Sequence, residues 1–293
     1  MKFLAALLIL FFFSACEKSI TIQPESQKPL LVVDGKIESG QRPFILLSTS
    51  LDFFSKINPD VLIASLVTNA KVTVSDGVST KELKEYKQLI GGIYNLTYYS
   101  SDTLNSTTDI IGESGKTYKL LIDYNNQQYT SVTTIPQVAK TIDSIWWKPA
   151  PHNDDTTKAV LMGKFTDPKG YGNYIRYFTK VNSDIYLPGA LSVFDDDLTD
   201  GTTYDFEIDQ GMNRNDPPKN DNYSFFERGD TVTVKLANID KATYDFWRTL
   251  EFAYQSVGNP FSSPVKVLGN VSNGALGAFC GYADQYKSIV IPK

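Results

Sequence analysis

Apolar and polar residues alternate along much of the chain with the two-residue period of half-buried β-strands. Segments 69–75 and 231–236 keep this alternation over their whole length, so each is expected to bury one face. Other runs are rich in β-branched, aromatic or aliphatic residues and have the length of strands. They cover residues 30–33, 44–47, 93–99, 118–122 and 289–291. The pattern predicts a chain built mainly of strands.

Residue pairs that favour tight turns stand between or beside these runs. Asp76-Gly77, Asn125-Asn126 and Asp200-Gly201 contain residue types that tolerate the positive φ angles of such turns. Short strands separated this often are typical of β-sandwiches and barrels. We therefore expect an all-β protein with two β-sandwich-like domains.

One segment departs from the strand period. Asp240 stands where its side chain can cap a helix, and bulky residues then follow at three- and four-residue spacing. We predict one short helix near residues 240–254. Packing of its aromatic stripe against a sheet is favoured over contact with a cofactor. The spaced positions are Tyr244, Trp247, Leu250, Glu251 and Tyr254.

The start of the chain has a different pattern. Lys2 precedes an unbroken apolar run from Phe3 to Phe13, and two small residues then lead to Cys16. This order describes a secretory signal, and the run is too short to span a bilayer. We expect a bacterial lipoprotein signal peptide, cleavage before Cys16, and a membrane anchor attached to that cysteine. The alternative is an ordinary secretory signal with an incidental cysteine.

The remaining length indicates two domains after the signal peptide. Strand-like sequence stops at residues 135–140, where a proline would break a β-ladder. We predict a signal peptide at 1–15, a lipidated tether at 16–28, an immunoglobulin-like β-sandwich at 29–136 and a second β domain at 137–293.

Composition removes several classes of function. The chain has 28 Lys and Arg against 33 Asp and Glu, a net charge of -5, so a nucleic-acid partner is not expected. It has one histidine, His152, and two cysteines, of which Cys16 would carry lipid and Cys280 lies in an apolar stretch that favours burial. Neither a catalytic triad with its usual motif nor a His and Cys zinc site can be assembled. We expect no catalysis and no cofactor, although paired carboxylates for glycoside hydrolysis stay open.

The acidic turn at residues 195–201 is the best candidate for a metal site. Asp195, Asp197 and Asp200 could supply the oxygen ligands that calcium prefers. Aligned with a calcium-binding loop, however, the segment places Leu198 where an oxygen is needed. A solvated turn between strands is therefore the favoured interpretation, and no metal is expected.

Two aromatic pairs are candidates for partner binding. Phe53 and Phe54 lie in a long connection that either covers its own end of the sandwich or meets a partner. Trp146 and Trp147 are adjacent, and adjacent strand residues face opposite sides. One ring could lie at the domain junction while the other meets a ligand or partner. A pair buried between two sheets is the alternative.

Several short motifs occur in a fixed order along the chain. They cover residues 31–35, 165–170, 173–176, 229–232, 244–247, 258–261 and 270–279. Together they resemble a Bacteroidota lipoprotein family catalogued as a domain of unknown function (family 4249). The resemblance implies an all-β outer-membrane lipoprotein, often encoded beside a TonB-dependent receptor, with an accessory role in nutrient capture.

From these features we expect an outer-membrane, lipid-anchored protein that acts as a non-catalytic binding or accessory subunit. A TonB-dependent receptor is the expected partner. The alternative is a structural, adhesion or envelope-assembly lipoprotein, and an enzyme is the third class. The sequence leaves the ligand open, and also whether the protein faces the periplasm or the cell surface.

Overall fold

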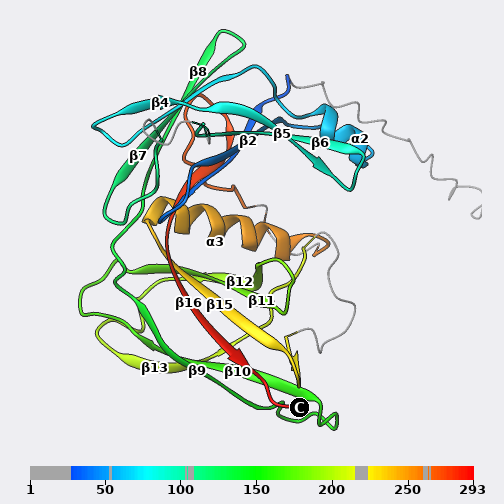
Figure 1. Cartoon of the computed structure of the whole chain (residues 1–293), viewed down its shortest axis with the longest axis vertical. Helices are drawn as coiled ribbons and strands as arrows, with labels where there is room; N and C mark the ends of the chain where they lie inside the picture. The colour runs from blue at the N-terminus through cyan, green and yellow to red at the C-terminus, as the bar shows by residue number, and fades with distance from the viewer. Residues whose placement is uncertain are drawn as a thin grey trace, which may run out of the picture.

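The computed structural model describes residues 28–52, 55–102, 104, 109–214, 224–259, 263 and 265–293. Strands form three sheets that make two sandwiches (Figure 1). The strands are β1 (Leu31–Glu38), β2 (Phe44–Thr49), β3 (Lys71–Ser75), β4 (Thr80–Glu82), β5 (Lys84–Ile90), β6 (Tyr94–Ser100), β7 (Thr117–Tyr124), β8 (Gln127–Thr134), β9 (Thr141–Pro149), β10 (Lys158–Thr166), β11 (Tyr174–Val181), β12 (Leu187–Phe194), β13 (Thr203–Ile208), β14 (Phe226–Glu227), β15 (Thr231–Ile239) and β16 (Leu276–Val290), and the helices are α2 (Pro59–Ala64) and α3 (Lys241–Ser256).

A single eight-stranded sheet connects the two sandwiches, in the order β12-β11-β15-β16-β1-β2-β6-β5. Its centre is β16, which is 15 residues long. The first part of β16 pairs in parallel with β1, and the rest pairs antiparallel with β15. Tyr282 has a partner on both sides, Glu38 and Ile239. Figure 1 shows β16 running from one sandwich into the other.

The first sandwich places the sheet β4-β3-β7-β8 over the β1-β2-β6-β5 half of the long sheet. The β7–β8 turn uses Asn125 and Asn126 at φ angles of 51° and 58°, as the sequence predicts. Phe279 of β16 is fully buried in this core although it lies near the other end of the sequence. The core includes Leu31, Val33, Ile37, Ile45, Leu47, Val72, Val74, Tyr99, Tyr118, Leu120, Ile122, Ile135 and Phe279.

The second sandwich packs β9, β10, β13 and β14 against β12, β11 and β15. Alternate residues of β15, namely Val232, Val234 and Leu236, face this core. Because Val232 pairs with Ile289 and Leu236 with Gln285, the same face continues onto the odd positions of β16. Phe279 lies on that face, so both smaller sheets pack on one side of the long sheet. The core consists of Ile142, Ala159, Leu161, Phe165, Ile175, Tyr177, Ile208, Phe226, Val232, Val234, Leu236 and Ile291.

Helix α3 covers the middle of the opposite face. The Asp240 side chain caps it by accepting a hydrogen bond from the Thr243 amide at 2.8 Å. Tyr244 and Trp247 pack with Cys280 and Tyr282 of β16, whereas Tyr254 is exposed, so the predicted helix is confirmed and the packing of its stripe is confirmed in part. Cys280 is buried, and burial raises the pKa of its thiol to about 12. It is therefore a small core residue, as its surroundings in the sequence predict.

The all-β fold with sandwich-like layers is confirmed, and the connection from β8 to β9 falls at the predicted boundary. The two halves nevertheless share the long sheet, because β16 from the range 137–293 contributes to the core of 29–136. That residues 29–136 and 137–293 form two independent domains stays a prediction. In the part of the chain that the structure describes, no helix has the length and apolar character needed to cross a membrane.

Candidate functional site

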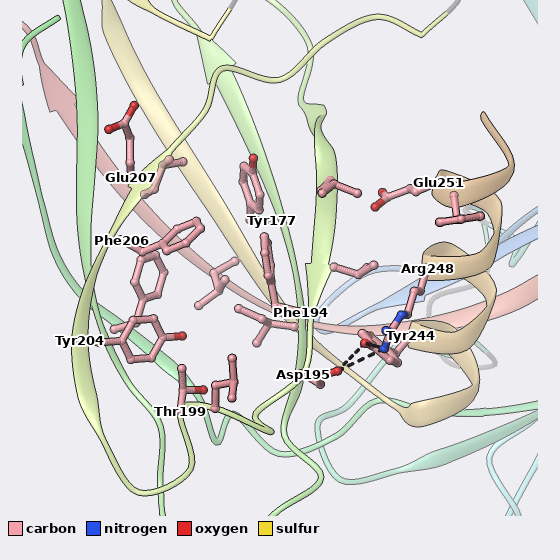
Figure 2. Close-up of a pocket in the computed structure, with 18 of the residues that line it drawn as sticks. Tyr177, Phe194, Asp195, Thr199, Tyr204, Phe206, Glu207, Tyr244, Arg248 and Glu251 are labelled. Carbon is pink, nitrogen blue, oxygen red and sulfur yellow. Dashed lines mark hydrogen bonds and ion pairs between the residues drawn. The ribbon is translucent and has the colours of Figure 1, made fainter. Parts of the chain in front are cut away.

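The second sandwich is open along one side. Strands β12 and β13 are edge strands of the two sheets that form it, and a cleft of about 590 Å³ lies between them and extends to α3. Figure 2 shows Tyr204 and Phe206 of β13 on one side of the cleft, Phe194 at the end of β12 in the middle, and α3 on the other side. The cleft therefore exists because the two sheets separate at this edge.

Aromatic and aliphatic side chains make most of the cleft wall. Phe194 lies between Tyr177 and Phe206, at ring-centroid distances of 6.1 and 5.6 Å. Large apolar side chains at the rim are exposed to solvent, Leu198 almost completely at 97%. Concave, mainly apolar surfaces with a few polar groups are typical of ligand sites. The exposed apolar rim residues are Leu191, Leu198, Phe206 and Phe252.

Asp195, Tyr244 and Arg248 form a polar cluster beside α3. The Tyr244 hydroxyl donates to Asp195 Oδ2 at 2.6 Å, and Arg248 Nη1 lies 3.3 Å from the same oxygen. Arg248 also donates to the Tyr244 hydroxyl. Burial, followed by the Asp195 carboxylate, raises the pKa of Tyr244 above its usual value. The phenol is thus a protonated donor at neutral pH, and the cluster satisfies its own polar groups.

Glu251 joins α3 to the edge strand β12. Its buried carboxylate accepts hydrogen bonds from the Ser192 amide at 2.9 Å and from the Ser192 hydroxyl, and Arg214 Nη2 lies 2.8 Å away. Arg176 is also buried. It donates to Ser192 Oγ at 3.1 Å and stacks 3.4 Å from the ring centroid of Trp247. This network fixes one wall of the cleft.

Glu207 lies at the β13 side of the cleft. Partial burial, followed by the nearby Asp209 carboxylate, raises the pKa of Glu207. Burial also raises the pKa of Asp209. Additional negative charge is therefore unfavourable here, which favours a ligand that brings no anion to this end of the cleft.

The acidic turn predicted as a possible calcium site is engaged with the protein. Asp195 binds Tyr244 and Arg248, and the Asp200 carboxylate accepts a hydrogen bond from the Gly170 amide. Among the described residues, no three or more His, Cys, Asp or Glu side chains group as metal ligands would. The structure therefore does not bring Asp195, Asp197 and Asp200 together.

The predicted partner-binding aromatics lie outside the cleft or outside the described residues. Trp147 pairs with buried Leu161 and packs against the second core, with Arg228 stacked 4.7 Å from its ring centroid. Trp146 pairs with Met162, so the two rings face opposite sides of the sheet. Their partner role stays a prediction. Cys16, Phe53 and Phe54 lie outside the described residues.

Sequence reasoning did not find the cleft. Its wall combines residues of β10 to β13, β15 and α3. Of these residues, only Asp195 was a predicted site residue. A local signal was present in β13, where Thr203–Ile208 alternates polar and apolar residues and places Tyr204, Phe206 and Ile208 on one face. The sequence does not show that this face borders a gap, because the opposite wall comes from distant segments.

Fold and site together define an all-β, two-sandwich protein with an open apolar cleft. The chain belongs to the family described as Domain of unknown function (DUF4249), whose sequence profile matches residues 17–288. The match includes both sandwiches and α3, and it confirms the family resemblance of the sequence motifs. No curated protein matches the sequence significantly.

Proposed function

We propose that this protein is an outer-membrane lipoprotein that acts as a non-catalytic binding subunit, partnered with a TonB-dependent receptor in nutrient uptake. The observation that carries the binding role is the apolar cleft between β12, β13 and α3. Its volume of about 590 Å³ lies within the range of small-molecule pockets. The signal segment before Cys16 supports the anchor, and the family resemblance supports the receptor partnership.

The ligand that fits the cleft has a mainly apolar body. Buried aromatic contacts contribute most to binding energy, and Tyr177, Phe194 and Phe206 offer such contacts side by side. The ligand could be a small molecule or an apolar segment of a larger one, because the cleft is open along its length at the two edge strands.

The polar groups of the cleft support binding rather than catalysis. Asp195 is held by Tyr244 and Arg248, and Glu251 is held by Ser192 and Arg214. The donors that hold each carboxylate come from the protein itself, so the hydrogen bonds of these groups are directed to the cleft wall. We propose that these groups form a rigid part of the cleft wall and orient the ligand that binds there.

The partnership is tested by purifying the tagged protein from detergent-solubilised outer membranes of its own cells. We expect a TonB-dependent receptor to copurify and Cys16 to incorporate labelled fatty acid. Cys16→Ala should lose the label and accumulate as the uncleaved precursor. Copurification of adhesion or assembly proteins in place of a receptor would favour the structural, adhesion or envelope-assembly class.

The cleft is tested with Leu191→Asp, which places a charge at the apolar rim. Binding of the neutral fluorescent probe phenylnaphthylamine should fall strongly, because a carboxylate disfavours apolar contact. Ile185→Asp is the matched control, since Ile185 is exposed in the β11–β12 turn and does not line the cleft. Both variants should keep the wild-type melting temperature. Equal probe binding in all three proteins would exclude the cleft as the binding site.

A further inference from the structure

The hairpin of β5 and β6 ends in an apolar turn region. Leu89, Ile90 and Ile93 are all exposed, Ile93 at 75%. Leu89 and Ile90 are adjacent strand residues and face opposite sides of the hairpin. Each face at this end of the hairpin therefore exposes an apolar side chain to solvent, which the packing of one face against a core does not explain. Gly91 and Gly92 form the turn between them and Ile93, with φ angles of 59° and 72°.

Helix α2 adds to this surface. It lies against β6, and none of its side chains is buried. Leu62 on α2 is exposed, and Ile57 just before the helix is 72% exposed. Figure 1 shows α2 and the turn joining β5 to β6 at the same end of the first sandwich. We call the exposed residues of this end the apolar tip: Ile57, Leu62, Leu89, Ile90 and Ile93.

The described chain begins beside the apolar tip. The Leu30 amide donates to Ser50 Oγ at 3.0 Å, and the Ser50 amide donates to the Leu30 carbonyl at 2.8 Å. The neighbouring Thr49 amide donates to the carbonyl of Ser65, which caps the end of α2, at 2.9 Å. The start of β1 and the end of α2 are thus joined through the end of β2.

The length of the preceding segment keeps this end close to any lipid on Cys16. Lys28, the first described residue, follows Cys16 by twelve residues. A segment of this length reaches at most about 40 Å when fully extended. A protein anchored at Cys16 therefore presents the end that carries Leu30 and α2 within that distance of the bilayer.

We infer that the apolar tip contacts the lipid bilayer and inserts into its headgroup region. The inference rests on the lipid anchor of the proposed function. Apolar side chains on both faces of a protruding hairpin suit a lipid surface, which surrounds whatever enters it, better than a protein interface on one side. Shallow insertion of apolar side chains strengthens attachment in proportion to the area buried. The tip would fix the orientation in which the cleft faces its partner.

The test is a fluorophore at the tip of the full-length protein, purified from membranes and placed in vesicles. The vesicles contain phosphatidylethanolamine and phosphatidylglycerol with brominated phosphatidylcholine as quencher. Ile93→Cys carries the label, because Cys280 is buried and Cys16 is expected to carry lipid. Val78→Cys is the matched control. Val78 is 94% exposed in the β3–β4 turn, and Figure 1 shows β4 on the opposite side of this sandwich from α2.

We expect the label at residue 93 to lose most of its emission to brominated lipid, and the label at residue 78 to keep its emission. Quenching at neither position, or equally at both, would overturn the inference. Shielding of residue 93 from aqueous iodide only in native membranes that hold the receptor would assign the tip to a protein partner, and would also overturn it. Incorporation of labelled fatty acid at Cys16 tests the lipid anchor independently of the quenching measurement. If Cys16 carries no lipid, the proposed anchor is wrong. Quenching at residue 93 with added vesicles then still tests whether the apolar tip contacts the bilayer.

Discussion

The two sandwiches share one sheet but differ in how their edges are closed. In the first, Ser272 continues the pairing of β8, since its amide donates to the Thr130 carbonyl at 2.8 Å and its hydroxyl accepts from the Thr130 amide. Buried tyrosines also close the ends, with the Tyr99 hydroxyl donating to the Val67 carbonyl at 3.1 Å. In the second, the described chain after β13 meets only the start of β12, where the Met212 amide donates to the Pro188 carbonyl at 2.9 Å, and the apolar cleft lies beside the rest of β12.

The difference shows that a sandwich needs additional segments to seal its edges, and that an unsealed edge exposes core-type side chains. The first sandwich also has a hollow, of about 660 Å³, between Thr68 and the β7–β8 turn. Its lining is mainly polar, with Asn69, Asp123 and Asn125 among the residues. The hollow of the first sandwich is therefore mainly polar, whereas the cleft of the second offers an apolar surface to a ligand.

The largest expected effect comes from Phe279→Ala, which removes a β16 side chain from the first core. A buried Phe→Ala change lowers the free energy of unfolding by about 3 to 5 kcal/mol. All three tryptophans lie in residues 137–293, so their fluorescence reports the second half during urea unfolding. We expect the tryptophan transition to shift with that of the first half, which hydrogen exchange reports. Two separate transitions would show that the halves unfold independently, and Val78→Ala should leave both unchanged.

Lys140→Met should destabilise the protein by a similar amount, about 3 to 5 kcal/mol, because it leaves a buried charge without a partner. Lys140 Nζ lies 2.8 Å from Asp167 Oδ2, and both side chains are fully buried. The double variant Lys140→Met with Asp167→Leu should recover much of the loss. Chemical denaturation measures all three proteins. Lys158→Ala is the control, since it breaks an exposed pair with Glu227 that contributes about 1 kcal/mol or less. Equal effects of Lys140→Met and Lys158→Ala would contradict the role of burial.

A smaller effect is expected from pH, and it arises in the shared sheet. Lys235 Nζ lies 3.0 Å from Glu38 Oε2 and 2.9 Å from Asp284 Oδ2. Burial raises the pKa of Asp284 to about 6, while Lys235 opposes the rise and Glu38 adds to it. The folded protein therefore binds this proton more tightly than the unfolded chain. The free energy of unfolding should fall as pH rises from about 4 through about 6, by up to about 3 kcal/mol.

Asp284→Asn should remove this slope when stability is measured by denaturation across that range. Glu38 acts at lower pH, because Lys235 and Lys36 outweigh the effect of burial and lower its pKa. Asp76 in the first sandwich gives the opposite sign. A hydrogen bond from the Ser79 amide, with others, lowers the pKa of Asp76, so its contribution is lost as pH falls. A slope that persists in Asp284→Asn would assign it to other groups.

The smallest effect is expected from Asp240→Ala, at about 1 to 2 kcal/mol. This residue caps α3 and also accepts from the Thr134 amide at 2.7 Å, so it joins the helix to the first sandwich. Asp240→Asn keeps an acceptor and should restore most of the loss in thermal unfolding. Asn58→Ala removes the cap of the exposed α2 and should cost less. The reverse order would mean that α3 does not depend on its cap.

The sequence predicted elements better than it predicted their partners. Alternating positions such as 231–236 and the Asn125-Asn126 turn identify strands and hairpins because their signals are local. The α3 helix was found for the same reason. Helix α2 was missed although Asn58 caps it and Pro59 occupies its first turn, because six residues are too few to show a helical period.

Long-range features had no local signal. The pairing of Val32 with Leu276 joins distant parts of the chain. The residue pattern of neither segment indicates that the other is its strand partner. The buried network of Arg176, Ser192 and Glu251 was also not foreseen. Arg176 reaches Glu251 through the Ser192 hydroxyl and stacks on Trp247, and these contacts join three separate elements. The cleft depends on where two sheets part, which is a property of the assembled fold.

The parallel pairing of β1 with β16 has a consequence for the newly made chain. One of the first strands to emerge during synthesis cannot find its neighbour until one of the last has been made. Contacts between such distant segments slow folding, because the entropy of closing a long loop is lost before the pairing contributes any stabilisation. Until then β1 offers one unpaired edge that other chains can bind. We therefore expect this protein to need protection from aggregation until β16 is complete, and to acquire both sandwiches late and together.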